Sequence, residues 1–186
     1  TLIKRFSETR RAHPLATDQL TIPECVALER ALLEGIREVS HAIDTSHLSA
    51  NALRHWVRQF VSLDASHLTV IFQSFGFKHG VPLDADFIFD ARSLPNPYYD
   101  PMLRPLTGKD APVIAFLENQ PLVRLLQEDI TAFVDKWLPP ITHENRQYVT
   151  VAIGCTGGQH RSVYLVEQIS RYFAENWQVL VRHREA

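Results

Sequence analysis

The sequence contains little cysteine and methionine and has no long apolar run. Its two cysteines, Cys25 and Cys155, lie far apart, and we expect free thiols in a reducing compartment rather than a disulfide. No apolar stretch approaches the roughly 20 residues that a membrane span requires. The only methionine is Met102 and the first residue is Thr1, so we expect the chain to begin inside a larger protein. These features predict a cytoplasmic protein with no membrane partner.

Neither sign of charge is in large excess. The chain has 19 lysines and arginines against 21 aspartates and glutamates, which excludes a uniformly basic nucleic-acid binder and leaves a local basic patch as the only form of RNA surface. The 9 histidines form no pair at metal-ligand spacing beside cysteines or carboxylates, so we expect no metal site. No Gly-x4-Gly-Lys-Ser/Thr run is present, so we expect no nucleotide cofactor and no ATP hydrolysis in this chain alone.

The first part of the chain, residues 1–64, has helical patterns and very little strand. A basic helix is expected over residues 2–11, and Thr21 with Glu24 forms a capping pattern before a second helix. Residues 42–46 read as a short strand, and residues 53–60 as a further helix with one apolar face. One short strand is too little sheet for a self-contained α/β domain. We therefore expect residues 1–64 to be the end of another domain.

The second part, residues 65–186, alternates strand and helix patterns. Strands are predicted over residues 68–72, 87–90, 148–153 and 179–181, and helices over residues 122–137 and 161–173. Pro139 and Pro140 are expected to end the first of these helices, and a long proline-rich loop covers residues 94–101. This alternation predicts an α/β domain with a mostly parallel sheet flanked by helices.

A glycine-rich turn joins the strand at residues 148–153 to the helix that begins near Arg161. Adjacent glycines allow several amide N–H groups to point at one spot, and the helix N-terminus adds partial positive charge there. Arg161 can donate to two oxygens of an anion, while the hydroxyls of Thr156 and Ser162 can donate as well. Residues 155–162, called the cradle below, therefore predict a phosphate site.

The cradle also has Cys-x5-Arg-Ser spacing, which resembles the loop of cysteine-dependent phosphatases. In that alternative the Cys155 thiolate attacks phosphorus, and the cationic loop lowers the thiol pKa. The preceding residue is Gly154, whereas that pattern usually has a histidine there. A third reading is a structural turn without a ligand. We favour binding without chemistry.

Other polar residues follow neighbouring strands. Asp90 and Arg92 come after the strand at residues 87–90, where ligands of open parallel sheets bind, although the two could also form an ordinary surface ion pair. The basic turns at residues 76–80 and 103–109 could face RNA phosphates or a ligand, or be solvated turns.

Three stretches together resemble one family: residues 74–82 (SFGFKHGVP), 90–97 (DARSLPNP) and 153–162 (IGCTGGQHRS). They resemble the RapZ family of RNase adapter proteins and the related YvcJ-type nucleotide-binding proteins. The resemblance implies that residues 1–64 are the end of a P-loop kinase-like domain that binds ATP or GTP in the full-length family, and that residues 65–186 form a phosphofructokinase-related domain.

The resemblance also implies a function. The adapter senses glucosamine-6-phosphate, binds a small regulatory RNA, presents it to an RNase E-type endonuclease and forms homo-oligomers. It places the sugar phosphate on Asp90, Arg92, Cys155, Thr156, Gly157, Gly158, His160, Arg161 and Ser162, and RNA on Lys78, His79, Arg182 and Arg184. The alternatives are ATPase or GTPase activity of the full-length protein and a Cys155-dependent phosphatase.

Overall fold

The computed structural model describes residues 3, 6, 12–17, 19–38, 40, 43, 45, 50–63, 67–142 and 146–186, without the side chains of 37, 38, 50, 51 and 55. The chain divides into two units, Thr1–Ser46 and His47–Ala186. The basic helix expected over residues 2–11 and the strand expected over residues 42–46 fall largely outside the described residues. No helix in the described part is long and apolar enough to cross a membrane.

The first unit contains helices α2 (Ile22–Leu32) and α3 (Glu34–Glu38). The predicted helix start is confirmed, because the Glu24 carboxylate accepts hydrogen bonds from the Thr21 amide at 2.8 Å and from its hydroxyl at 2.6 Å. These bonds lower the pKa of Glu24. Cys25 is buried, and its thiol donates to the Leu15 carbonyl at 3.6 Å.

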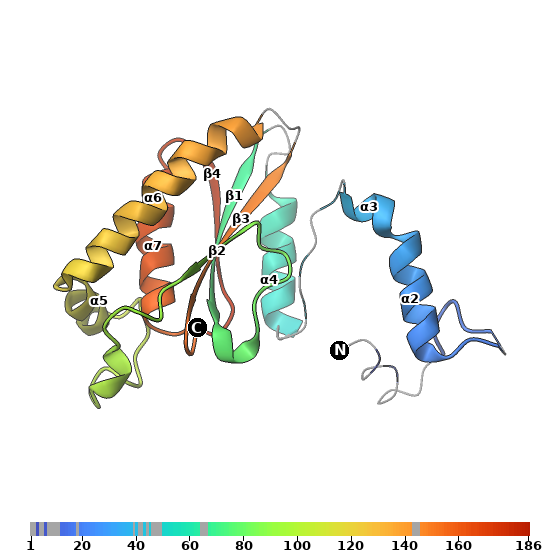
Figure 1. Ribbon diagram of the computed structural model, residues 1–186, viewed down its shortest axis with the longest axis horizontal. Coiled ribbons are helices and arrows are strands. Elements are labelled where there is room, and N and C mark those ends of the chain that lie inside the picture. Colours follow the sequence, from blue (N-terminus) through green and yellow to red (C-terminus); the bar gives the residue numbers. More distant parts are fainter. Residues whose placement is uncertain are drawn as a thin grey trace. The chain divides into compact units, whose positions relative to one another are not determined.

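The second unit is built on a four-stranded sheet in the order β2-β3-β1-β4 (Figure 1). The strands are β1 (Thr69–Gly76), β2 (Phe87–Asp90), β3 (Tyr148–Cys155) and β4 (Gln178–His183). All three neighbouring pairs are parallel. The predicted α/β class with a parallel sheet is confirmed, and all four strands end at the same edge.

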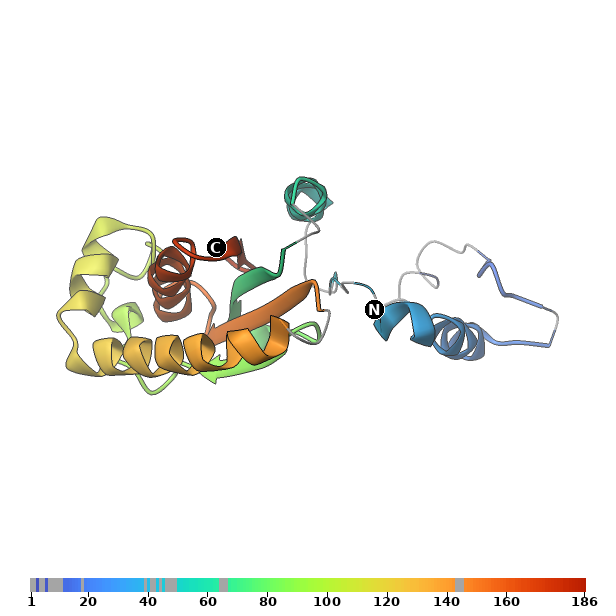
Figure 2. The ribbon, with the colours of Figure 1, turned by 90° about the horizontal axis from the view of Figure 1, so that it is seen from above.

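One face of the sheet holds the main core. It is covered by α5 (Ala111–Glu118), α6 (Pro121–Thr142) and α7 (Arg161–Phe173), which bury Val123, Ile130, Leu165 and Ile169 against Phe72 and other strand residues. On the other side lies α4 (Ala50–Val61), as Figure 2 shows. There the guanidinium of Arg182 lies 4.6 Å from the ring centre of Trp56.

Pro139 and Pro140 do not end α6, which continues to Thr142. That part of the prediction is wrong. The additional turn is held by packing, because Leu138 is buried and Ile141 packs against the core, and the Thr142 hydroxyl donates to the Pro139 carbonyl at 2.7 Å. Burial of these side chains offsets the amide bonds that the prolines cannot form.

Candidate functional site

The cradle lies at the edge where the strands end, between β3 and the first residue of α7. In the register of the sheet, Gly76 at the end of β1 is next to Cys155, and Asp90 at the end of β2 is next to Gly154. Two short 3-10 helices border the same edge, η1 (Phe77–His79) and η2 (Pro97–Tyr99). The sheet thus brings together the three stretches on which the sequence prediction rested.

Gly158 makes the turn of the cradle possible. Its φ is +75°, a left-handed conformation that residues with a side chain rarely adopt. A Cβ atom at this position would also collide with a Glu185 carboxylate oxygen and would lie 2.6 Å from the Gly76 nitrogen. Gly76 is equally constrained, because its Cβ would lie 2.7 Å from the Gly157 carbonyl carbon. The loop and the end of β1 are therefore in backbone contact.

Cys155 lies at the base of the cradle with only 3% of its surface exposed. Its sulfur is 3.2 Å from the Ser162 hydroxyl oxygen. Burial is the largest single influence on the Cys155 pKa and raises it, but hydrogen bonds from the Ser162 hydroxyl and amide and from the Gly158 amide, with the charge of Arg161, lower the pKa overall. The cradle therefore stabilises negative charge at its base.

Arg161 is buried, and much of its guanidinium is used within the protein. Its Nη1 donates to the carbonyls of Arg92 and Leu94, each at 2.9 Å, and its Nη2 donates to the Thr156 hydroxyl at 3.3 Å. We expected Arg161 to grip two oxygens of an anion, but the carbonyls of the loop after β2 take Nη1. Its Nε is buried and has no hydrogen-bond partner among the residues that the structure describes.

His160 and Gly108 join the cradle to the proline-rich loop. His160 is buried, with Nε2 at 3.2 Å from the Leu103 carbonyl oxygen, and the Gly108 amide donates to the Gln159 carbonyl at 2.8 Å. His160 was predicted as a phosphate ligand, and the structure places its Nε2 at the Leu103 carbonyl of the loop. Together with the two Arg161 bonds, these contacts fix residues 92–108 against the cradle.

Lys78 lies on the other side of the cradle. Its amide donates to the Thr156 carbonyl at 3.2 Å, and its ammonium lies 3.8 Å from where a Gly157 Cβ would be. We expected Lys78 to contact RNA, and the fold places its charge directly beside the glycines of the cradle. It is exposed and can meet an anion bound there.

Asp90 and Arg92 pair with each other. Arg92 donates to Asp90 through Nε at 3.0 Å to each carboxylate oxygen and through Nη2 at 2.7 Å, and its guanidinium lies 3.9 Å from the Phe77 ring centre. The hydrogen bonds to Arg92 lower the pKa of Asp90. The Asp90 side chain is 46% exposed and the Arg92 side chain 50% exposed, so the pair borders the cradle at the surface.

Two of the four cations predicted to contact RNA are buried. Arg182 is 1% exposed and packs on Trp56. Burial lowers its pKa to about 10, although the negative charge of Asp84 acts to raise it. The Arg184 side chain is 3% exposed, and its Nη2 donates to the His79 carbonyl at 3.0 Å. Burial removes both arginines from the expected RNA surface, which leaves Lys78 and His79.

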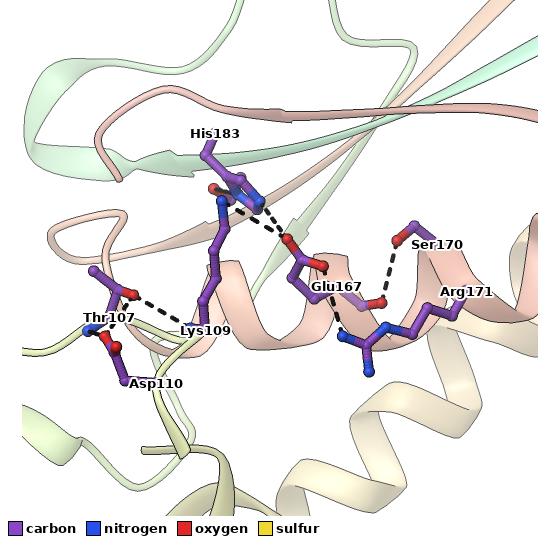
Figure 3. A network of polar contacts seen from close by, with 8 residues as sticks. Thr107, Lys109, Asp110, Glu167, Ser170, Arg171 and His183 are labelled. Carbon is purple, nitrogen blue, oxygen red and sulfur yellow. Dashed lines mark hydrogen bonds and ion pairs between the residues drawn. The ribbon is translucent and has the colours of Figure 1, made fainter. Parts of the chain in front are cut away.

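The structure also contains a polar network that the sequence prediction missed. Glu167 on α7 is 3.0 Å from His183 Nε2 and 3.8 Å from the Lys109 ammonium, and Arg171 approaches it at 3.9 Å (Figure 3). His183 Nδ1 is 2.8 Å from the Ser74 hydroxyl. A Ser-His-Glu chain can activate a serine, but Ser74 is fully buried and cannot meet a substrate. The network instead ties β4 to α7 and to the loop at Lys109.

No group of three histidine, cysteine, aspartate or glutamate side chains that could hold a metal occurs within the described ranges. The site is thus a glycine-rich turn at the N-terminus of a helix in a parallel α/β domain. This class of site binds phosphate groups through amide N–H groups and nearby cations.

Comparison with known proteins identifies the family. Residues 68–186 match the RapZ C-terminal domain, and residues 1–65 match the RapZ-like N-terminal domain. The chain therefore belongs to the RapZ family.

Its relatives include proteins named nucleotide-binding protein. One from Janthinobacterium sp. is 58% identical over 99% of this chain and 67% of its own length, and one from Chromobacterium violaceum is 59% identical over 100% of this chain and 66% of its own length. The chain spans about two thirds of the length of these relatives.

Proposed function

We propose that this chain is the ligand-sensing and RNA-binding part of a RapZ-like RNase adapter. The cradle binds the phosphate of glucosamine-6-phosphate, and a small regulatory RNA competes for the same edge of the sheet. In the whole protein, the bound RNA is presented to an RNase E-type endonuclease. We also propose that the protein acts as a homo-oligomer, and that ATP or GTP binding belongs to the whole protein. The relatives described above are named nucleotide-binding protein.

The donors around the cradle are the observation that carries this proposal. Among the described residues, the buried Arg161 Nε has no hydrogen-bond partner. Lys78 lies beside Gly157, and the N-terminus of α7 adds partial positive charge. A buried donor without a partner is costly, so an anion that accepts from it is favoured. Gly157, Gly158, Thr156 and Ser162 complete the phosphate side in this proposal, and Asp90 and Arg92 border the sugar.

Competition follows from the charge of both ligands. RNA affinity depends on phosphate contacts and the release of counterions, and Lys78 and His79 supply such contacts beside the cradle. A sugar phosphate in the cradle neutralises Lys78, so it removes a contact that the RNA needs.

The proposal is tested by fluorescence anisotropy with a labelled RNA hairpin. Glucosamine-6-phosphate should release the RNA, and Lys78→Met should weaken binding of both ligands and reduce the salt dependence of RNA binding by about one phosphate contact. Lys136→Met is the matched control, because Lys136 is exposed on α6. RNA binding that is indifferent to saturating sugar phosphate would contradict the proposal.

A cysteine-dependent phosphatase is the second candidate, and the lowered pKa of Cys155 favours it. In that reaction the thiolate attacks phosphorus, the alcohol leaves with a proton from an acid, and water hydrolyses the thiophosphate. Asp90 is a carboxyl at this edge, but its lowered pKa keeps it ionised and makes it a poor proton donor. Turnover of a phosphate ester that disappears in Cys155→Ser would establish this candidate, whereas a sensor should keep its affinity in that variant.

A further inference from the structure

A carboxylate that the sequence did not indicate lies against the cradle. Glu185 follows the end of β4, and its Oε2 accepts a hydrogen bond from the Gly76 amide at 3.0 Å. Its Oε1 accepts from Arg184 Nε at 3.1 Å, and the side chain is 12% exposed. The carboxylate is thus held in place and remains partly accessible.

The position of Glu185 is defined by the glycines of the cradle. Its Oε2 occupies the space where a Gly158 side chain would begin, while the Lys78 ammonium lies next to Gly157. Adjacent glycines of one anion site therefore have a carboxylate at one and an ammonium at the other. An anion that carries no positive group of its own is repelled by the Glu185 carboxylate and attracted by the Lys78 ammonium.

The other carboxylates near this edge are more fully engaged. Asp90 accepts from both nitrogens of the Arg92 fork. Glu167 meets His183, Lys109 and Arg171 (Figure 3). Each oxygen of Glu185 accepts one of the two bonds described above, and a carboxylate oxygen can accept more than one hydrogen bond. Glu185 therefore retains acceptor capacity beside the cradle.

We propose that Glu185 is a specificity-determining residue, and that its carboxylate makes the cradle prefer a phosphate ester that carries a protonated amine over the same ester with a hydroxyl. This inference rests on the proposed function and adds the group that recognises the amine. The phosphate lies toward Lys78 and Gly157, and the ammonium donates to Glu185. The ligand's two charges then match the two charges beside the glycines.

The charges that face Glu185 come from two elements. Arg184 precedes it in the chain, and His79 lies on η1, which also carries Lys78 beside Gly157. Burial raises the pKa of Glu185, while Arg184, the Gly76 amide and His79 act in the opposite direction. A cationic ligand group favours the ionised carboxylate, so binding of an ammonium is consistent with this environment.

The test compares glucosamine-6-phosphate with glucose-6-phosphate by calorimetric titration of the wild-type chain and Glu185→Gln near neutral pH. Glutamine keeps an oxygen for the Gly76 amide, but it removes the charge and the oxygen that accepts from Arg184 Nε. We expect the wild-type chain to prefer the amino sugar roughly tenfold, the effect of one hydrogen bond to a charged group, and Glu185→Gln to lose that preference. Glu175→Gln, at an exposed glutamate, should keep it.

Asp90→Asn tests which of the two carboxylates at this edge recognises the amine. A wild-type preference that survives in Glu185→Gln, or that disappears only in Asp90→Asn, would overturn the inference. Equal wild-type affinity for the two esters would also overturn it but would leave the anion site standing. If the wild-type chain binds neither ester, the proposed sugar-phosphate function itself fails.

Discussion

Substitution of Gly158 by alanine should destabilise the His47–Ala186 unit strongly. A φ of +75° costs an alanine about 1–2 kcal/mol. The new Cβ would also lie 2.6 Å from the Gly76 nitrogen and collide with the Glu185 carboxylate, and overpacking of this kind costs about 1–3 kcal/mol. Because backbone atoms of β1 cannot yield without disturbing the sheet, we expect a total loss of roughly 2 to 5 kcal/mol.

Two other glycines show the cost of an unusual backbone conformation and the cost of an added Cβ atom separately. Gly80 has a φ of +87° and a ψ of 156°, a conformation almost confined to glycine, with nothing within 4 Å of its Cβ position, so Gly80→Ala should show a conformational cost alone, about 1–3 kcal/mol. Gly157→Ala meets only Lys78, at 3.8 Å or more, and should change stability by less than about 1 kcal/mol.

Urea unfolding followed by circular dichroism measures all three variants. The reasoning fails if Gly158→Ala is no less stable than Gly157→Ala, because the close contact between the cradle and β1 would then be absent.

Three further predictions concern the surroundings of the cradle. Ser162→Ala should raise the pKa of Cys155, measured by the ultraviolet absorbance of the thiolate against pH; an unchanged pKa would show that the hydroxyl does not stabilise it. Burial lowers the pKa of His183, so the unfolded state binds more protons below pH 6.5 and stability should fall as pH falls through the lowered pKa. His183→Gln should flatten this dependence of stability on pH. The same slope in the wild-type chain and in His183→Gln would refute the assignment of this dependence to His183. Arg161→Lys should cost about 2 to 4 kcal/mol, because one ammonium cannot reach two carbonyls and a hydroxyl, whereas the exposed Arg171→Lys should change stability by less than about 0.5 kcal/mol, and equal losses would contradict this account.

Much of the fold could be predicted from periodicity. The strand patterns at residues 68–72, 87–90 and 148–153 identify β1, β2 and β3, and α7 has the predicted bounds, because buried strands and amphipathic helices leave regular apolar patterns. The extension of α6 past Pro139 could not be predicted this way, since it depends on Leu138 packing against distant strands. The helix α5 was also missed.

The candidate site shows the same division. The glycines and the cations of the cradle could be recognised locally, because they are consecutive in sequence. The use of Arg161 Nη1 by the carbonyls of Arg92 and Leu94 could not, since those atoms come from a loop almost 70 residues away in the chain. Glu185 reaches the cradle only through the pairing of β4 with β1, so no local pattern marks it.

The central claim is that the cradle binds the phosphate of an amino-sugar phosphate, and a titration followed by nuclear magnetic resonance tests it most directly. Glucosamine-6-phosphate should shift the amide signals of Gly157, Gly158 and the other cradle residues in a saturable manner, and inorganic phosphate should shift a subset of them more weakly. Lys78→Met should weaken both titrations. If saturating ligand leaves the cradle amides unmoved, or moves only residues on other elements, the account is contradicted.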